Sequence, residues 1–284
     1  MFAIDRDYVK SALPARDPAG HKGTFGKVCL LGGSVGYTGA PVLCARGAVR
    51  GGCGLVFLGV PQEVWPIAAV KCDEAMPFPL PSAEGRLSLD AEAELRRRAA
   101  GCGVLAIGCG MGRGDETDAL TRRLLTMELP LVLDADGINA LSGHIDELSC
   151  RRSLVTVLTP HDGELARIGG DMAAPRESAA SDFAVRRGVY LVRKGRRTVV
   201  AAPDGRLAVN TTGNDGMAKG GSGDVLTGLL ASLLAQGTEP FAACCAAVWL
   251  HGRAGDLAAA DKGRRGMTPV DMIEKLSYAL KEVE

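Results

Sequence analysis

Short apolar runs recur along the chain, and each gives way to glycine or polar residues before an amphipathic stretch begins. The runs are too short for helices and too apolar for strands with one face in solvent, so we interpret them as strands buried on both faces. They are KVCLLGG (27–33), GLVFLGV (54–60), VLAIGCG (104–110), LPLVLDADG (129–137), LVTVLTP (154–160), YLVRKG (190–195) and TVVAAP (198–203). Helical spacing lies between them, at 40–53, 90–101 and 116–128. This alternation predicts a doubly wound, mostly parallel sheet with helices on both sides.

The pattern changes after residue 203. From there on the sequence predicts three helices, at 224–236, about 240–260 and about 268–283. The chain has 284 residues, of which 46% are hydrophobic, enough for a sizeable core. We find no linker, repeat or low-complexity segment. We therefore predict one domain over residues 1–284, a three-layer α/β/α fold without a separate lid domain.

Composition excludes several classes of function. Thirty-three basic side chains balance thirty-three acidic ones, so no global field attracts nucleic acid or anionic lipid, and we expect neither as a partner. The N-terminal segment MFAIDRDYVK has no apolar h-region, and no apolar stretch reaches membrane-spanning length. Together these features predict a cytoplasmic protein.

The cysteines and histidines do not form a recognisable framework. Nine cysteines include no CxxC pair, and the four histidines also lack the spacing of zinc ligands. Cys244 and Cys245 are neighbours in an apolar helical run, AACCAAVWL (242–250), which we interpret as core rather than as an interface. The pattern favours buried free thiols in a reducing compartment.

The strand ends predict where a ligand binds. In doubly wound sheets ligands bind beyond the carboxyl ends of the parallel strands. Five of the predicted strands end in polar or glycine-rich sequence, namely GGSVGYTGA, GCGMGRGDE, DADGIN, TPHDGE and KGRRT. We expect these segments to form the rim of one cleft.

A glycine-rich segment directly before a helix predicts an anion hole. In GGSGD, Gly220, Gly221 and Gly223 free the backbone to adopt positive φ, and the N–H groups at the helix start, with Ser222, favour a phosphate. Two interpretations of Asp224 stay open: it is only the N-cap of a core helix, or it is a general base beside the phosphate. The helix N-terminus should lower its pKa and make it a weak base.

Two other phosphate-binding motifs do not fit. No lysine completes GxxxxGK[ST], and GCGMGRG lacks the GxGxxG spacing and a ribose-binding acid. A nicotinamide-dependent dehydrogenase is therefore disfavoured, and some other nucleotide chemistry is indicated.

GGSGD before an apolar helix resembles the anion-hole motif of the ribokinase-like superfamily. Within that superfamily, the ADP/ATP-dependent NAD(P)H-hydrate dehydratase family is similar over residues 21–271. The segments that carry the resemblance are HKGTFGKVCLLGGS (21–34), TGAPVLCARGAVRGGCGLV (38–56), LDADGIN (133–139), LTPHDGE (158–164), RKGRRTVV (193–200) and NDGMAKGGSGDVLTG (214–228).

The resemblance implies a repair enzyme, a lyase with a ribokinase-like fold. Such an enzyme removes water from the S-form of NADH or NADPH hydrate by phosphorylating the ring hydroxyl and eliminating phosphate, with ADP or ATP as donor and Mg²⁺ as its metal. We also expect a homo-oligomer. Only about twenty residues precede HKG, so we expect the hydrate epimerase to be a separate protein.

Roles for individual residues follow from the same resemblance. Asp224 would meet the substrate hydroxyl and Gly223 the transferred phosphate. The turn Lys194, Gly195, Arg196, Arg197 and Thr198 would bind the adenosine monophosphate part; without the resemblance it is a solvated hairpin tip.

The substrate side of the cleft is implied in the same way. The positions concerned are Ala40, Gly110, Gly112, His161 and Asn139, with Asp136 on the same rim. Each has a structural alternative: His161 as a helix cap, and the aspartates and asparagine of DADGIN as turn formers. Glu164 would help organise magnesium or simply begin a helix.

The chain departs from the family at one loop. Gly108-Cys109-Gly110-Met111-Gly112 stands where the family has GPGLG, so a proline that fixes φ is missing and a less rigid loop is expected. Two other functions stay open: a small-alcohol or vitamin-precursor kinase of the same fold, and a noncatalytic nucleotide sensor.

Overall fold

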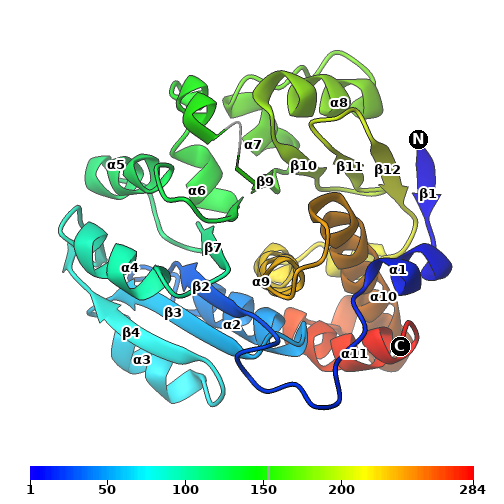
Figure 1. Cartoon of the computed structure of the whole chain (residues 1–284), viewed down its shortest axis with the longest axis horizontal. Coiled ribbons are helices and arrows are strands. Elements are labelled where there is room, and N and C mark those ends of the chain that lie inside the picture. Colours follow the sequence, from blue (N-terminus) through cyan, green and yellow to red (C-terminus); the bar gives the residue numbers. More distant parts are fainter. Residues whose placement is uncertain (152–153) are drawn as a thin grey trace.

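A ten-stranded sheet with helices on both faces forms the body of this computed structural model, which describes residues 1–151 and 154–284 (Figure 1). The strand order is β1-β12-β11-β10-β9-β8-β7-β2-β3-β4. Every pairing is parallel except those of β11 with its two neighbours. The predicted α/β/α architecture with a mostly parallel sheet is confirmed.

The predicted strands are all present. They are β2 (Lys27–Leu31), β3 (Leu55–Pro61), β7 (Val104–Ile107), β8 (Leu131–Leu133), β9 (Thr156–Leu158), β10 (Tyr190–Arg193) and β11 (Val199–Ala201). The structure adds β1 (Phe2–Ile4), β4 (Met76–Leu80), β12 (Leu207–Asn210) and a separate hairpin, β5 (Ser82–Ala83) with β6 (Arg86–Leu87). Strand β4 contains Pro77 and Pro79, and it lies at the edge of the sheet, where prolines are tolerated.

Alternate residues of the central strands enter two different cores. Val28 and Leu30 of β2 pack into one apolar cluster, and Cys29 and Leu31 pack into the other. Because period-2 alternation sends successive side chains to opposite faces, a strand that is apolar throughout is buried on both sides. This is why the strands of this chain show no alternation of polar and apolar residues.

The helices form the two outer layers. On one face lie α2 (Gly39–Arg50), α3 (Trp65–Lys71), α9 (Ser222–Ala235), α10 (Pro240–Gly266) and α11 (Pro269–Lys281), with α1 (Arg6–Ala12) packed on α10. On the other lie α4 (Ala91–Ala99), α5 (Asp115–Leu124) and α8 (Arg176–Arg187), while the short α6 (Ala135–Asn139) and α7 (Asp162–Arg167) follow β8 and β9. Two 3₁₀ segments are also present, Ile145–Arg151 and Asp215–Met217.

The last three predicted helices are confirmed as α9, α10 and α11. Residues 242–250 lie inside α10, and Cys244, Cys245 and Leu250 have no exposed surface. The apolar run is thus core, as predicted. All nine cysteines are free: six are buried, Cys53 and Cys72 are partly buried, and Cys150 is exposed. None of the helices in the described ranges is long and apolar enough to cross a membrane.

Helix α9 is central to the fold. It packs against α2, α10 and strands β2 and β7, and Figure 1 shows it end-on near the middle of the molecule. A Cβ at Gly228 would lie 1.9 Å from the carbonyl oxygen of Cys44, so only glycine permits this close approach of α9 to α2. The N-terminus of α9 is thereby held at the carboxyl edge of the sheet.

Candidate active site

The start of α9 has the backbone of an anion hole. Gly221 precedes the helix with φ +99°, and no side chain caps the first turn. The N–H of Ser222 donates to the carbonyl oxygen of Lys219 at 3.3 Å, which leaves the N–H groups of Gly223 and Asp224 available to an anion. A Cβ at Gly221 would also lie 2.5 Å from Leu43 Cδ1. Of the three glycines expected to adopt positive φ, only Gly221 does so. Gly223 is already inside the helix, and Gly220 has open space beside it.

Ser222 is buried and held by contacts within the protein, so its side chain does not face a ligand. Its side chain is buried, with Oγ 3.8 Å from Met272 Sδ, and its carbonyl oxygen accepts a hydrogen bond from His251 Nε2 at 2.8 Å. Burial lowers the pKa of His251 to about 4, so the imidazole is neutral and donates from Nε2. Sequence analysis missed this anchoring histidine because it lies in the middle of α10, far from any motif.

Asp224 is the third residue of α9 and not its N-cap, which corrects one of the two interpretations. Its expected low pKa is also wrong. Burial raises the pKa of Asp224 to about 7, the neighbouring Asp134 carboxylate adds to the rise, and the Cys109 thiol and Lys194 partly oppose it. The favourable effect of a helix N-terminus is smaller than the cost of burying this charge. A carboxylate that titrates near 7 is suited to general base catalysis at neutral pH.

Lys194 belongs to this cluster rather than to the hairpin tip. Its Nζ lies 2.6 Å from Asp134 Oδ1 and 3.7 Å from Glu164 Oε2, and its side chain is only 19% exposed. Burial alone would lower the pKa of Lys194, but Asp134 and Glu164 outweigh it and the pKa is raised. The site therefore holds a fixed positive charge close to the start of α9.

Asp134, which follows β8 directly, organises the cluster, and sequence analysis did not single it out. One oxygen accepts from Lys194, and the other accepts from Thr227 Oγ1 at 2.7 Å, one turn into α9. Asp134 is 1% exposed. The sequence shows Asp134 only as the first aspartate of DADGIN. Its partners Lys194 and Thr227 lie 60 and 93 residues further along the chain, so no local pattern connects them to it.

The rest of the turn after β10 lies at the surface. Gly195, Arg196 and Arg197 are exposed, and Arg197 adopts φ +58°. Thr198 Oγ1 donates to the carbonyl oxygen of Gly195 at 3.0 Å, which closes the turn. The structure thus places these four residues at a hairpin tip beside the Lys194 cluster, and their nucleotide-binding role stays a prediction.

His161 and Glu164 form a capping box at the start of α7. His161 Nδ1 accepts from the N–H groups of Gly163 and Glu164, and Glu164 Oε2 accepts from the N–H of His161 at 2.8 Å. The contacts of His161 are therefore those of a helix cap, the structural alternative to a substrate-binding role. Its ring is still 54% exposed at the rim of the sheet, so it remains accessible to a ligand.

The glycine-rich loop after β7 joins the remaining candidates. Gly110 has φ +64°, and a Cβ there would lie 2.8 Å from Ala40 Cβ, so these two positions face each other closely. The N–H of Gly112 donates to Asp136 Oδ2 at 2.9 Å. Asn139 lies next to them, with its Nδ2 3.4 Å from Asp136 Oδ1 and its oxygen accepting from Arg167.

The two unusual residues of this loop are both buried. Cys109 is 3% exposed and Met111 is 1% exposed. The backbone is tied on both sides, because the carbonyl oxygen of Cys109 accepts from the N–H of Gly33 and that of Gly110 accepts from Ser34 Oγ. The buried side chains and these hydrogen bonds therefore restrain the loop, although it lacks the proline that the family has there.

The described residues do not form a ready-made magnesium site. Cys109, Asp134 and Asp224 place potential ligand atoms within 4.8 Å of one another, but a thiol is a poor ligand for Mg²⁺. Both oxygens of Asp134 are already engaged. Glu164 accepts from a backbone N–H and lies 3.3 Å from His161 Nε2, so its magnesium role has no support in its contacts and stays a prediction.

Solved structures show which class of protein the fold and site define. A ribokinase-like superfamily protein from Enterococcus faecalis V583 matches with a TM-score of 0.84 over 99% of this chain and 96% of that chain, at 24% identity, and shows the fold. This chain is an α/β protein with the ribokinase-like fold, and Asp224 lies in the first turn of its helix α9.

The comparison of sequences narrows this class to one family. The chain belongs to the NAD(P)H-hydrate dehydratase family, whose model matches residues 28–277. It is similar to the bifunctional NAD(P)H-hydrate repair enzyme Nnr of Moorella thermoacetica, at 44% identity over 98% of this chain and 53% of that protein. It is also similar to the ADP-dependent (S)-NAD(P)H-hydrate dehydratase of Neisseria meningitidis serogroup B, at 39% identity over 86% of this chain and 80% of that protein.

A solved structure agrees with these relatives. The ADP/ATP-dependent NAD(P)H-hydrate dehydratase of Bacillus subtilis, co-crystallised with ATP and Mg²⁺, matches with a TM-score of 0.83 and 30% identity over 99% of this chain and 98% of that chain. The chain spans about half the length of the curated bifunctional relatives it matches. Family membership thus rests on nearly the whole of this chain.

Proposed function

We propose that this protein dehydrates the S-form of NADH hydrate and NADPH hydrate, restoring the reduced cofactor at the expense of a nucleotide phosphate. The observation that carries the proposal is the half-buried Asp224, with a pKa of about 7, at the uncapped start of α9. Relatives named for this reaction support the choice of substrate.

The reaction begins with phosphoryl transfer. Asp224 takes the proton of the ring hydroxyl as the hydroxyl oxygen attacks the terminal phosphorus of ADP or ATP, and AMP or ADP leaves. The N–H groups at the start of α9 and the charge of Lys194 stabilise the transferred phosphate. Elimination follows: the carbon–oxygen bond breaks, phosphate leaves with the bonding pair, and loss of the neighbouring C–H proton restores the ring double bond.

The family resemblance and the position of the turn after β10 support a place for the donor. The turn Lys194–Thr198 lies beside the anion hole and is proposed to hold the adenosine monophosphate part, with Gly223 at the phosphate. Magnesium is proposed to enter with the nucleotide, because Mg²⁺ in such sites is ligated largely by phosphate oxygens and water. Ala40, Gly110, Gly112, Asn139 and His161 are proposed to face the hydrated dinucleotide.

The proposal also covers the partner enzyme, the cellular location and the assembly of the protein. An epimerase that interconverts the two hydrate forms is the proposed partner in the pathway, and the bifunctional names of several relatives support it. A cytoplasmic location, a single domain and a homo-oligomer are proposed on the sequence and the family resemblance alone.

The decisive experiment incubates the purified protein with hydrated NADH and Mg²⁺, with ADP and ATP in separate reactions. We expect nucleotide-dependent return of NADH absorbance with an equal amount of released phosphate. A stable phosphorylated product without NADH recovery would instead establish a kinase. Nucleotide binding without turnover, unchanged in Asp224→Asn, would indicate a sensor.

A further inference from the structure

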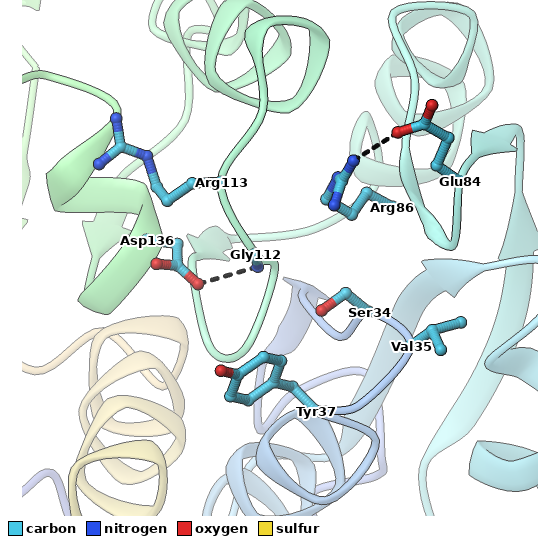
Figure 2. Close-up of a pocket in the computed structure, with 8 residues that line it drawn as sticks. All are labelled: Ser34, Val35, Tyr37, Glu84, Arg86, Gly112, Arg113 and Asp136. Carbon is cyan, nitrogen blue, oxygen red and sulfur yellow. Dashed lines mark hydrogen bonds and ion pairs between the residues drawn. The ribbon is translucent and has the colours of Figure 1, made fainter.

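A polar cavity lies next to the glycine-rich loop of the candidate active site. It encloses about 320 Å³ between the β2–α2 loop, the β5–β6 hairpin, the β7–α5 loop and α6 (Figure 2). The side chains that matter here are those of Ser34, Tyr37, Arg86, Arg113 and Asp136, with the backbone of Gly112.

The cavity lies beside residues proposed to face the hydrated ring. Gly112 lines it, two residues after Gly110, which packs against Ala40 and Tyr37. Cys109 of the same loop places its Sγ within 4.8 Å of an Asp224 carboxylate oxygen. One short loop therefore connects the proposed base to the cavity.

Two guanidinium groups stand on different walls of this cavity, as Figure 2 shows. Arg86 lies along the loop, with its Cδ 3.2 Å from where a Cβ of Gly112 would be, and it pairs through Nη2 with Glu84 at 2.7 Å. Arg113 pairs through Nε and Nη2 with Asp118. Each pairing orients a guanidinium and leaves donors of the five-N–H group for another acceptor.

The acceptors around the two arginines are already engaged. Two carboxylates line the cavity and both have partners: Asp136 accepts from the N–H of Gly112, and Glu84, which is 82% exposed, pairs with Arg86. Asp118 is not among the lining residues. The groups free to meet a ligand are thus mainly donors, which suits an anion with several oxygens.

We propose that Arg86 and Arg113 bind the pyrophosphate of the dinucleotide substrate, an inference that rests on the proposed function. With the hydrated ring beside Asp224, the pyrophosphate is the first anionic group met along the rest of the substrate. The donor nucleotide has a different place, because its turn follows β10, and β9 and β8 separate β10 from β7 in the sheet. Substrate tail and phosphoryl donor therefore approach Asp224 from opposite sides.

The test uses Arg86→Ala, Arg113→Ala and the double variant, with unhydrated NADH as the binding probe. Titration of NADH, followed by its fluorescence or by calorimetry, is expected to show at least about tenfold weaker binding for each single variant, the loss of a charge-assisted hydrogen bond. Wild-type affinity should fall as salt rises, and less steeply in the double variant. With NADH hydrate, KM should rise while kcat changes little.

Arg97→Ala is the matched control, because Arg97 pairs with Glu94 on the surface of α4 and does not line the cavity. It should leave NADH affinity and KM unchanged. Melting curves of all variants exclude unfolding as the cause of weaker binding.

Three outcomes would overturn the inference. NADH binding and KM unchanged in the double variant would remove the arginines from the site. A loss confined to NADPH and its hydrate would assign them to the 2′-phosphate instead. A loss confined to ADP or ATP would assign them to the donor. If NADH binding depends on the arginines but no hydrate is consumed, the proposed function fails and the dinucleotide site stands.

Discussion

Asp134 and Asp224 bring carboxylate oxygens within 4.8 Å of each other at the carboxyl edge of the sheet, and Lys194 forms its ion pair with Asp134 at 2.6 Å. Because Lys194 is paired with Asp134, it lowers the pKa of Asp224 less than burial and the Asp134 carboxylate raise it, and that pKa rises to about 7. Asp134 fixes the cation, and Asp224 is left as the group that exchanges a proton near neutral pH.

The pH dependence of turnover should report this pKa. A general base acts only when ionised, so the rate should be highest above pH 7 and fall about tenfold per pH unit well below it. The measurement is kcat/KM for hydrate dehydration from pH 5 to 9. A rate that stays constant down to pH 5 would mean that no base with the pKa of Asp224 takes part.

Replacing Asp224 by asparagine should remove turnover and keep nucleotide binding. The amide has a similar shape but accepts no proton, and loss of a positioned base costs roughly two to four powers of ten in rate. Single-turnover assays and nucleotide titration test the two halves separately. Near-wild-type turnover by Asp224→Asn would exclude the residue as the base.

The same substitution should change stability in a pH-dependent way. The pKa of Asp224 is raised on folding, so its carboxyl destabilises the native state as pH rises from about 4 to 7 and the group ionises. Asp224→Asn is therefore expected to be more stable than the wild type at pH 8, by an amount on the order of a few kcal/mol, and to lose most of this gain at pH 4. Urea unfolding at both pH values measures the difference. A gain that is equal at both pH values would contradict the raised pKa.

Removing the charge of Lys194 should destabilise the fold. Lys194→Met leaves the buried Asp134 without its cation, and breaking one half of a buried pair costs about 3–5 kcal/mol. Lys275→Met is the matched control, since Lys275 pairs with the half-exposed Asp261 and its loss should cost no more than about 1 kcal/mol.

A second variant keeps this prediction testable if Lys194→Met folds poorly. The double substitution Lys194→Met, Asp134→Asn removes both charges, so part of the lost stability should return. Equal unfolding free energies for Lys194→Met and Lys275→Met would show that the pair contributes no more than a surface ion pair.

A methyl group at Gly223 should reduce turnover without unfolding the protein. A Cβ there would lie 3.5 Å from Lys194 Nζ and 3.7 Å from Asp134 Oδ2, ordinary contacts that the fold accommodates, but it would occupy the place proposed for phosphate. Gly223→Ala should therefore lower kcat/KM at least about tenfold, the equivalent of about 1.4 kcal/mol.

Two further glycines serve as controls for this prediction. Gly101→Ala adds a methyl group in open space and should change neither activity nor stability. Gly228→Ala should destabilise, because its Cβ would meet the backbone of α2. Full activity in Gly223→Ala would show that no phosphate binds against this residue.

Much of the fold was predictable because apolar runs and helical spacing are local signals. Strands that are apolar throughout predicted a sheet buried on both faces, and Val28 and Cys29 do enter opposite cores. The edge strand β4 was missed, since its two prolines remove the signal that a central strand carries. The short β1 was also missed; it is defined by its pairing with β12, over 200 residues away.

The candidate site was predictable only in outline. GGSGD located the start of α9, and the strand ends located the rim. The partners of Asp134 and the anchor His251 could not be found in this way, because each contact joins segments far apart in the chain. The pKa of Asp224 was predicted in the wrong direction, since sequence shows a helix N-terminus but not the burial or the second carboxylate.

The sequence by itself determined the layered α/β class and the position of helix α9, because these depend on periodicity and on residues adjacent in the chain. Its resemblance to a family then singled out Asp224 as the proposed base. Only the tertiary structure decided which charges surround that base. Electrostatic interactions depend on distance and burial, and the fold alone brings Lys194, Asp134 and Asp224 together at the edge of the sheet.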